Sequence, residues 1–474
     1  MSLRALPGLL RSAIRREALA WLAVAVISAA PLQAAEPPLL TLDRLYETPS
    51  LVGVTPSSPA WSPDSRYVAF TWSDEGLPQR GLWLAARDGS DLRRLDTGPD
   101  KSASVREMAW LPDGSAVISL RGSELWSTSI AGGRDTLLAD IGEGAADLSV
   151  SPDGSQAAFR REGDLWLFDL DSRQATAATA VGMPRLSSLE IGRYSRPERE
   201  IGPGIWGGPT YAWSPDGRYI AVHYVDRRDM RQVPFPDYLA EETDPNKVRR
   251  GYPGDANEFR TVGLLQVADR ELQLLELANP TGTQVVGFDW SPGGILLLDI
   301  ASDTAVDRWL YTVEPGSLRP REIWHSHRES RIYTAFASAW HADGKRVVFL
   351  SDIGDRYGLY TIDGTASDAS PMRLSDPDYD VLGAPSVVAA ANEIYFAGNG
   401  EGPYERHAYR VGANGGEPER ITTRPGQHSA YPSPDGRHVA LLHSDDRTPT
   451  ELYLMGTGDS EPHRVTNSPL PGFA

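Results

Sequence analysis

The sequence of 474 residues contains no cysteine. Disulfide bonds, a thiol nucleophile, zinc–thiolate sites and a lipid-modified N-terminal cysteine are therefore excluded. The sequence also lacks Gly-x-Ser-x-Gly, the turn that carries the nucleophile of an α/β-hydrolase. A phosphate-binding glycine loop and a His-Glu-x-x-His zinc motif are missing as well. We therefore predict no catalytic residues, no cofactor and no metal, and whether the chain takes part in an enzyme stays open.

Positive charge is scarce, since 46 Lys and Arg stand against 64 Asp and Glu for a net charge of -18. A surface with this excess of negative charge repels nucleic acid and anionic lipid, so we exclude nucleic acid as a partner. Such a surface also favours solubility.

Long apolar runs are scarce too. An apolar run at residues 18–30 follows four arginines and precedes small residues and Glu36. It is shorter than the roughly 20 residues that span a bilayer, and the order of its parts is that of a secretory signal. We predict a signal peptide at 1–35 and an exported, periplasmic protein with no other membrane contact. An uncleaved signal would instead leave the chain membrane-anchored.

The abundant feature is a repeated phrase built on Ser-Pro-Asp-Gly. Its clearest copy runs from Tyr211 to Val222 as Tyr-Ala-Trp-Ser-Pro-Asp-Gly-Arg-Tyr-Ile-Ala-Val. Most intervals between copies are 40 to 50 residues, and two intervals of 63 and 77 residues flank the fourth copy. A period of roughly 40–50 residues is that of a propeller blade, so the two long intervals indicate insertions. The turn positions of the eight copies are Asp64, Asp113, Asp153, Asp216, Gly293, Asp343, Asn392 and Asp435.

Each copy has a physical interpretation as a hairpin. Proline presets the first central position of a tight turn, aspartate bonds the local backbone and glycine accepts positive φ. A third strand such as 82–84 and a short fourth such as 93–95 follow. We therefore predict an all-β fold, an eight-bladed β-propeller of four-stranded antiparallel blades with WD40-like or TolB-like Ser-Pro-Asp-Gly repeats.

The repeats also set the predicted boundaries. A leader at 36–55 precedes the propeller at 56–466, which carries an insertion at about 226–260, and a tail at 467–474 follows. Because the first and last copies each own four strands, the ring would close without exchange of a terminal strand. The leftover ends would then lead to another domain.

Several polar groups are candidates for a site. His325 and His327 alternate along a strand as a metal pair would, but no third ligand is evident. The aspartates of 376–380 suit calcium, yet the same residues suit an ordinary turn. We assign both groups to loops, and the charged run at 226–229 to surface ion pairs. Glu198 and Glu200 precede the fourth hairpin, where they would either bind a substrate amine at the channel or form a solvated loop.

The fourth copy and its insertion narrow the choice of relatives. The segments 212–217, Val233-Pro234 and Tyr252-Pro253, the last of these ahead of Thr261-Val262, resemble the N-terminal domain of dipeptidyl-peptidase IV-like proteins. These are serine peptidases of the prolyl oligopeptidase family. The opening segments, 42–46 and 51–53, are similar to the start of the same domain.

The resemblance implies that the propeller caps an α/β-hydrolase domain with a Ser-Asp-His triad and admits short peptides. It also implies a pair of glutamates ahead of the fourth hairpin that binds the free N-terminus of the substrate. Gly202 and Pro203 stand where that pair is expected. Glu198 and Glu200 are the nearby carboxylates, and they do not match the family pattern.

We therefore predict a non-catalytic propeller that gates and positions peptide substrates for proteolysis. The α/β-hydrolase domain would lie on a continuation or on a partner chain, because these 474 residues hold no triad. The alternative is a stand-alone periplasmic TolB-like propeller that acts as a protein-binding module. The expected partners are a peptide substrate and the hydrolase domain, and the oligomeric state, a homo-oligomer included, is left open.

Overall fold

The computed structural model describes residues 41–96, 103–132, 134–182, 197–204, 208–236, 238, 241–243, 247–278, 281–330, 336–354, 356–366, 369–471 and 473. The chain divides into two compact units, 1–48 and 49–474. In the first, the described part holds α2 (Leu42–Tyr46), where Thr41 Oγ1 accepts the N–H of Arg44 at 3.2 Å. Within the described ranges, no helix is long and apolar enough to cross a membrane. The predicted signal peptide at 1–35 lies outside the described residues.

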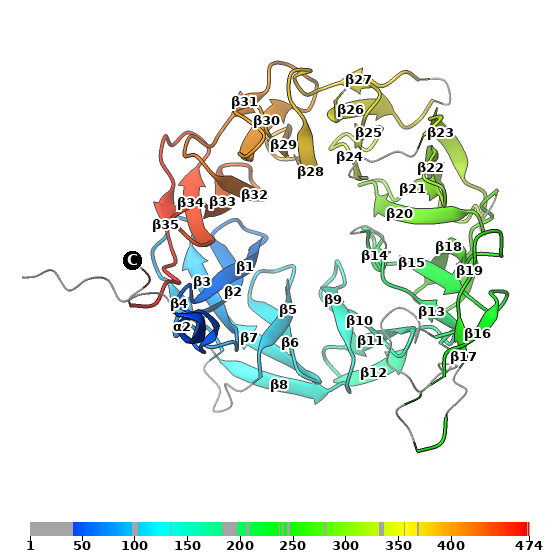
Figure 1. Ribbon diagram of the computed structural model, residues 1–474, viewed down its shortest axis with the longest axis horizontal. Coiled ribbons are helices and arrows are strands. Elements are labelled where there is room, and N and C mark those ends of the chain that lie inside the picture. Colours follow the sequence, from blue (N-terminus) through cyan, green and yellow to red (C-terminus); the bar gives the residue numbers. More distant parts are fainter. Residues whose placement is uncertain are drawn as a thin grey trace, which may run out of the picture. The chain divides into compact units, whose positions relative to one another are not determined.

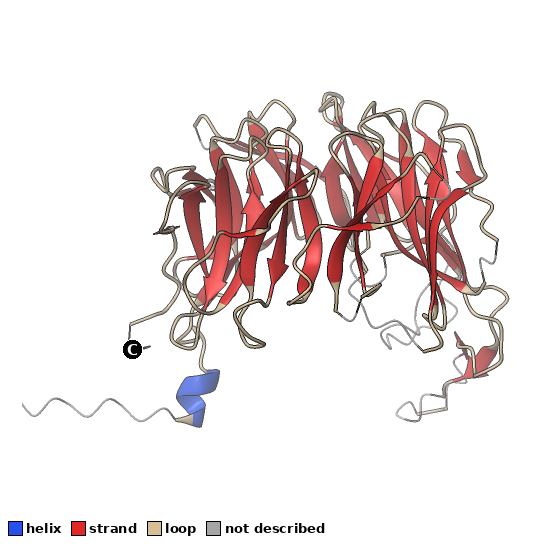
Figure 2. Cartoon of the chain, turned by 90° about the horizontal axis from the view of Figure 1, so that it is seen from above, coloured by secondary structure: helices blue, strands red, loops and turns tan. Residues whose placement is uncertain are grey.

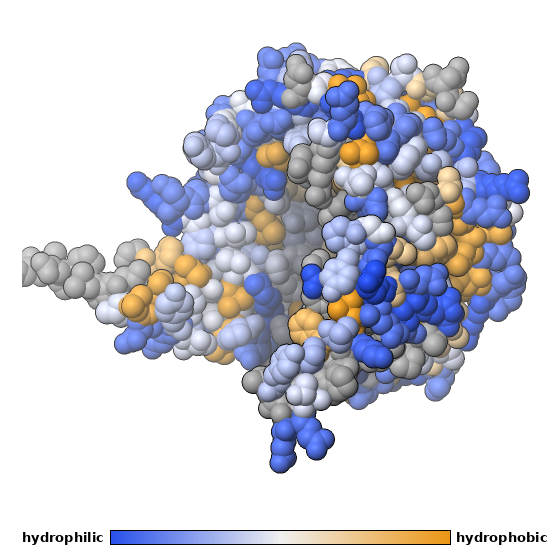
Figure 3. Space-filling view, turned by 45° about the vertical axis from the view of Figure 1, so that its right-hand side comes forward, coloured by the Kyte–Doolittle hydropathy of each residue, from blue (hydrophilic) through white to orange (hydrophobic). Residues whose placement is uncertain are grey.

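The second unit is a ring of eight antiparallel blades around a central opening (Figure 1). Seven blades have four strands that pair in chain order, and the fourth blade has five. This arrangement confirms the predicted eight-bladed propeller. Figure 3 shows that hydrophilic residues dominate the face in view and that the molecule is hollowed at its centre.

The strands of blades 1 to 3 are β1 (Val54–Trp61), β2 (Tyr67–Ser73), β3 (Gly81–Ala86), β4 (Arg93–Arg94), β5 (Val105–Trp110), β6 (Ala116–Arg121), β7 (Glu124–Ser129), β8 (Asp135–Asp140), β9 (Ala146–Val150), β10 (Gln156–Arg161), β11 (Asp164–Asp169) and β12 (Gln174–Ala177). Blade 4 contains β13 (Arg199–Ile201), β14 (Tyr211–Trp213), β15 (Tyr219–Asp226), β18 (Phe259–Gln266) and β19 (Leu272–Leu274). Blades 5 to 8 contain β20 (Thr283–Trp290), β21 (Leu296–Ser302), β22 (Asp307–Val313), β23 (Arg321–His327), β24 (Ser338–Trp340), β25 (Arg346–Ser351), β26 (Gly358–Asp363), β27 (Met372–Arg373), β28 (Val381–Val388), β29 (Glu393–Gly398), β30 (His407–Gly412), β31 (Glu419–Arg420), β32 (Gln427–Pro432), β33 (His438–Ser444), β34 (Glu451–Gly456) and β35 (His463–Arg464).

Blade 4 departs from the predicted pattern in two ways. Its innermost strand is broken, because β14 pairs with one end of β15 and β13 pairs with the other end. The insertion lies between β15 and β18 and contains its own two-stranded hairpin, β16 (Gln232–Pro234) with β17 (Lys247–Arg249). This hairpin projects from one face of the ring (Figure 2). The break and the hairpin place polar residues of distant sequence at one mouth of the channel.

The repeated phrase forms the turn that its residues predict. Ser214 Oγ donates to Asp216 Oδ1 at 2.7 Å and accepts the N–H of Tyr219 at 2.9 Å. Gly217 has a φ of +69°, a value that residues with a side chain seldom adopt. These bonds hold the pKa of the Asp216 carboxyl at about 2, chiefly through the Ser214 hydroxyl. The chemistry of the turn is therefore local, which explains why the sequence displays it.

Tryptophans tie several blades to the preceding blade. The indole N–H of the residue before a repeat turn donates to an inner strand of the preceding blade at 2.8 to 3.1 Å. The donor and acceptor pairs are Trp61 with Tyr431 O, Trp110 with Ala60 O, Trp290 with Ala212 O, and Trp340 with Asp289 O. The first of these pairs joins blade 1 to blade 8. The type of hydrogen bond that connects neighbouring blades therefore also helps to close the ring.

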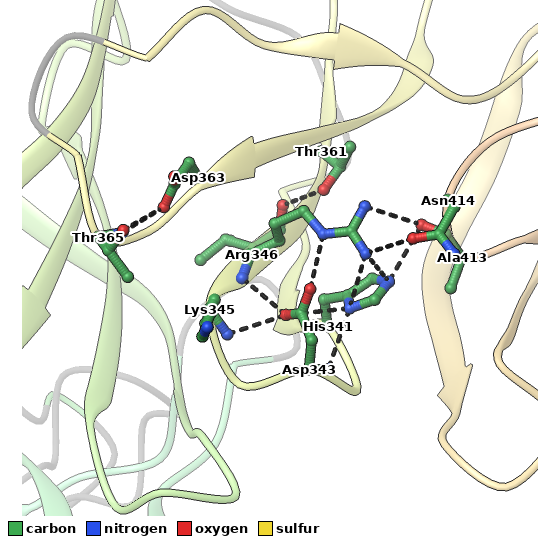
Figure 4. A network of polar contacts seen from close by, with 10 residues as sticks. His341, Asp343, Lys345, Arg346, Thr361, Asp363, Thr365, Ala413 and Asn414 are labelled. Carbon is green, nitrogen blue, oxygen red and sulfur yellow. Dashed lines mark hydrogen bonds and ion pairs between the residues drawn. The ribbon is translucent and has the colours of Figure 1, made fainter.

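In blade 6, a histidine takes the place of the turn serine (Figure 4). His341 Nδ1 accepts the N–H of Asp343 at 3.1 Å, and Nε2 lies 3.0 Å from the carbonyl oxygen of Ala413 in blade 7. Arg346 donates to Asp343 Oδ2 at 2.7 Å and to Asn414 Oδ1 at 2.7 Å. The larger side chain therefore keeps the turn and adds a polar joint between blades 6 and 7.

The ring closes without strand exchange, as the repeats predict, but the tail takes part in the closure. A hydrophobic cluster joins the two blades, with Trp61, Phe70 and Trp72 packed near Leu452 and Leu454. The C-terminal tail then crosses the seam between blades 8 and 1 in three contacts. Trp72 Nε1 donates to Ser468 Oγ at 3.0 Å, Leu470 N donates to Leu51 O at 3.0 Å, and Ser468 N donates to the buried Glu451 at 2.6 Å. Residues of the tail therefore contact both blades of the seam.

Candidate functional site

The richest polar site lies at the channel mouth opposite the repeat turns, at the broken inner strand of blade 4. We call it the blade-4 polar cluster, and its members are Glu198, Glu200, His223, Arg227, Arg249, Glu258 and Arg260. It unites β13, β15, β18 and the insertion hairpin.

Arg227 is the buried centre of this cluster. Its guanidinium lies 2.7 Å from Glu200 Oε1 and 2.7 Å from Glu258 Oε1, and it donates to Pro197 O at 2.8 Å. The side chain of Arg227 is 3% exposed and that of Glu200 is 5% exposed. A buried charge is costly unless it is paired and hydrogen-bonded, and here each charge has its counterpart. The predicted surface interpretation of 226–229 is thus wrong for Arg227, although the exposed Arg228 does pair with the partly buried Asp226.

Glu198 connects the insertion to the inner strand. Arg249 of β17 donates to Glu198 Oε1 through Nη2 at 2.5 Å and through Nε at 3.2 Å. The side chain of Glu198 is 16% exposed. Within the described part of the chain, its second oxygen, Oε2, has no hydrogen-bond partner and can accept one. The two predicted site residues therefore differ, since Glu200 is enclosed and Glu198 retains accepting capacity.

His223 fixes the loop that follows β13. Its Nδ1 lies 3.1 Å from the carbonyl oxygen of Pro203, which can only accept, so Nδ1 carries the proton. Nε2 then accepts from Arg260 Nη1 at 3.3 Å. Burial, with the nearby Arg260 charge, lowers the pKa of His223 to about 4, so the imidazole is neutral at pH 7. The backbone at Gly202 and Pro203, where the family's glutamate pair was expected, is held in place by this neutral ring.

The formal charges of the cluster cancel. Three carboxylates face three guanidiniums around a neutral imidazole. The arrangement therefore pins the insertion to blade 4 and offers no nucleophile or general base. What it offers to a ligand is hydrogen-bond acceptance at Glu198. No spacing pattern marks Arg227 or Arg249 as site residues, because their partners lie on other elements.

A second candidate lies between the inner strands of blades 7 and 8. A cavity of about 290 Å³ is lined by Ser386, Tyr395, Phe396, Arg406, His428 and Ser429, among others. A neighbouring cavity of about 360 Å³ shares Ser386 and Tyr431 with it. The 290 Å³ cavity exists because β28 bulges away from β29. In the register of the two strands, the three residues 383–385 stand opposite the single residue Phe396.

Three buried histidines stack beside this cavity. The ring centroids of His407 and His428 are 5.3 Å apart, and those of His428 and His443 are 4.3 Å apart. His407 bridges Thr422 Oγ1 at 3.0 Å and Glu405 at 2.7 Å, which is the order of groups in a hydrolase triad. However, Thr422 is 3% exposed and its oxygen already accepts the N–H of residue 408. The bridge therefore stabilises blade 7 and has no access to substrate.

The other sequence candidates occupy ordinary structural positions. His325 and His327 of β23 both contact Asp307 Oδ1, at 2.9 and 2.7 Å. Asp376 accepts the N–H of Asp378 within its own turn at 2.8 Å. The turn assignment is therefore confirmed for the aspartates, whereas the loop assignment is wrong for the histidines, which lie in strand β23.

Residues 139–450 match the family model described as Dipeptidyl peptidase IV (DPP IV) N-terminal region. The chain belongs to this family. The match spans blades 3 to 7 and the first two strands of blade 8, and it includes the broken strand and the insertion of blade 4.

Members of the DPP IV group are similar to the chain at low identity. The probable dipeptidyl-aminopeptidase B of Talaromyces marneffei is 22% identical over 351 residues, which cover 66% of this chain and 38% of the relative. The corresponding protein of Arthroderma gypseum is 24% identical over 316 residues, which cover 59% and 33%. The chain thus spans less than two-fifths of the length of these curated relatives.

Solved structures share the fold. Porphyromonas gingivalis dipeptidyl peptidase 4 superposes with a TM-score of 0.68 at 16% identity, covering 88% of this chain and 60% of that one. A putative dipeptidyl aminopeptidase IV from Bacteroides ovatus superposes with a TM-score of 0.64 at 13% identity, covering 87% and 60%. At these identities the likeness concerns the propeller architecture.

Proposed function

We propose that this propeller binds short peptides at its channel mouth and positions them for a serine peptidase of the DPP IV type. The α/β-hydrolase domain would be supplied by a continuation of the chain or by a partner. The observation that carries the proposal is the family match over a closed propeller whose insertion is pinned beside the inner strand of blade 4. The named relatives are dipeptidyl-aminopeptidases, and peptide binding by this chain is inferred from that relationship.

Within this proposal, Glu198 receives the free amino group of the peptide. An ammonium carries three donors and no acceptor, and Glu198 Oε2 is an anionic acceptor near the channel. Glu200 would support it indirectly, because its carboxylate is paired with Arg227 at 2.7 Å and is enclosed. The amine site would therefore rest on one carboxylate directly.

The test is a binding titration of the purified chain with short peptides that have free or acetylated N-termini. We expect the free peptides to bind more tightly, and Glu198→Gln to weaken them about tenfold, which corresponds to about 1.4 kcal/mol. Glu242→Gln, a change of the same type at an exposed residue of the insertion, is the matched control and should have no effect.

The outcomes separate the two parts of the proposal. Equal affinities in the Glu198→Gln and Glu242→Gln variants would reject the amine site alone. Absence of any peptide binding would reject the peptide-positioning function. Co-purification of an intact envelope protein in that case would favour the stand-alone binding module.

We also propose export to the periplasm through residues 1–35, on the basis of their sequence pattern. N-terminal sequencing of the protein recovered from the periplasm checks this, and a mature chain that begins near residue 36 is the expected result. Recovery of the full N-terminus from the cytoplasm would contradict it.

A further inference from the structure

Arg406 lies at the junction of blades 7 and 8 with its backbone held on both sides. Its N–H donates to Gly426 O at 3.0 Å, and its carbonyl oxygen accepts the N–H of His428 at 2.9 Å. These bonds fix the residue at the wall of the 290 Å³ cavity. The position of its side chain at this wall is therefore set by the fold.

The guanidinium of Arg406 is half-buried and has no hydrogen bond, ion pair or ring contact with any described residue. Nearby arginines of blade 7 are paired, since Arg420 lies 2.6 Å from Glu401 and Arg410 lies 2.8 Å from Glu419. The adjacent Glu405 is engaged by His407 instead. A partly desolvated cation without a counterion is a binding opportunity for an anion, because the anion would supply the missing hydrogen bonds.

The rest of the cavity wall combines apolar surface with hydroxyl groups, and one end of a peptide can contact both. Tyr395, Tyr431 and Ala430 provide apolar surface, and the hydroxyls of Ser386 and Ser429 have no hydrogen-bond partner within the described ranges. A volume of about 290 Å³ is at the lower end of the roughly 300–1,000 Å³ of ligand pockets. The cavity therefore fits one or two apolar side chains rather than a large cofactor.

His428 contributes a buried imidazole to this wall. Its Nε2 lies 2.8 Å from the carbonyl oxygen of Arg424, so Nε2 carries the proton and Nδ1 is the unprotonated nitrogen. Nδ1 is buried and has no partner in the described part of the chain. Because Nδ1 has almost no accessible surface, a ligand in the cavity meets the guanidinium of Arg406 and not this nitrogen.

We infer that the cavity between blades 7 and 8 is a carboxylate-binding subsite for peptides, in which Arg406 pairs with the carboxylate and the aromatic wall takes the adjacent apolar side chain. This inference rests on the proposed peptide-binding function. Two sources of the carboxylate share this chemistry, namely the C-terminus of the peptide and an aspartate or glutamate side chain.

The experiment titrates the purified chain with three probes, acetyl-Ala-Phe with a free C-terminus, acetyl-Ala-Phe-amide, and acetyl-Asp-Phe-amide. We expect a probe with a carboxylate to bind about tenfold more tightly than the uncharged amide. Tighter binding of acetyl-Ala-Phe identifies the C-terminus as the ligand, and tighter binding of acetyl-Asp-Phe-amide identifies the acidic side chain.

Arg406→Gln should abolish this difference between probes, whereas Arg437→Gln, at an exposed residue of the repeat turn in blade 8, should preserve it. Ala384→Trp provides a second variant, because Ala384 lines the cavity and is exposed, so a larger side chain fills the cavity without entering the core. Circular dichroism of each variant checks the fold.

Equal affinity of all three probes for the wild-type chain would overturn the inference and leave peptide positioning intact. An unchanged preference in Arg406→Gln would overturn it as well. If no peptide binds, acetylated or free, the proposed function fails and the subsite fails with it.

Discussion

Replacement of Glu451 by glutamine should loosen the seam between blades 1 and 8. This carboxylate is 0% exposed and holds the C-terminal tail against blade 8. Oε1 accepts Ser468 N at 2.6 Å and Arg464 Nη2 at 3.0 Å, while Oε2 accepts Thr466 Oγ1 at 2.5 Å and Ser468 Oγ at 3.1 Å. The tail in turn bonds blade 1 through Trp72. Loss of the carboxylate should therefore weaken ring closure, which no covalent link supports.

The magnitude follows from the kinds of bond that are lost. The amide oxygen of glutamine can replace Oε1, and the two hydroxyls near Oε2 can rotate to accept from the amide nitrogen. What disappears is the negative charge, and hydrogen bonds to charged groups contribute about 1.5–3 kcal/mol against about 0.5–1.5 for neutral ones. Over four bonds, of which about two keep a good partner, we expect a loss of about 2–3 kcal/mol in the free energy of opening the seam.

Hydrogen exchange measures this opening directly, because amides that exchange through local opening report its free energy. At 1.4 kcal/mol per factor of ten, exchange in β1 and β34 should become about 30- to 150-fold faster. Amides of β18, on the far side of the ring, should change little (Figure 1). Glu461→Gln, at an exposed glutamate of the same blade, is the matched control. Equal acceleration in β18, or less than threefold acceleration at the seam, would refute the role of the tail in closure.

Two further predictions concern the joints within the ring. Trp290→Phe removes the indole hydrogen bond to Ala212 O but keeps an aromatic ring, so we expect the free energy of unfolding, measured by urea denaturation, to fall by about 1–2 kcal/mol. An unchanged free energy of unfolding would show that this hydrogen bond does not hold blades 4 and 5 together. The pKa of His223 is lowered from 6.5 to about 4 by burial, so below pH 6.5 the unfolded chain takes up a proton that the folded chain does not. Stability should therefore fall by about 2 kcal/mol at this site between pH 7 and 5, and His223→Gln should reduce the slope by that amount, as urea midpoints at the two pH values would show.

The repeat turns were predictable because their chemistry is local. In Ser214-Pro-Asp216-Gly217 the hydroxyl, the carboxylate and the positive φ act within a few residues, so the pattern is visible in any one copy. The blade count and the four-stranded order followed from the spacing of those copies. Even the degraded seventh copy keeps the backbone requirement, since Asn392 has a φ of +53° in place of a glycine.

The candidate site was only partly predictable, because its contacts join residues that are far apart in the sequence. Glu198 and Arg249 are separated by 51 residues, and each alone has the features of a surface charge. Glu451 has no sequence feature that distinguishes it from an exposed glutamate such as Glu461. That Arg406 has no partner among the described residues depends on the bulge in β28 and on the contact of Glu405 with His407. Such facts arise from packing, which a single sequence does not display.

The two proposed contacts with a peptide lie at the same mouth of the channel. Glu198 precedes β13, which pairs with the end of β15 that is remote from its repeat turn. Arg406 precedes β30, which pairs likewise with the remote end of β29. Blade 4 and the junction of blades 7 and 8 lie on opposite parts of the ring (Figure 1). A peptide would thus meet an acceptor for its amine and a donor for its carboxylate on separate walls.

This separation determines how the two contacts combine. Changes at distant sites that share no partner usually add in free energy. For a peptide long enough to reach both walls, the losses from Glu198→Gln and Arg406→Gln should therefore add. A shorter peptide reaches one wall and should respond to one change alone. The shortest peptide for which the two losses add thus measures the distance between the two walls of the mouth. The repeat turns lie at the opposite mouth and carry neither group, so changes in them should not alter peptide binding.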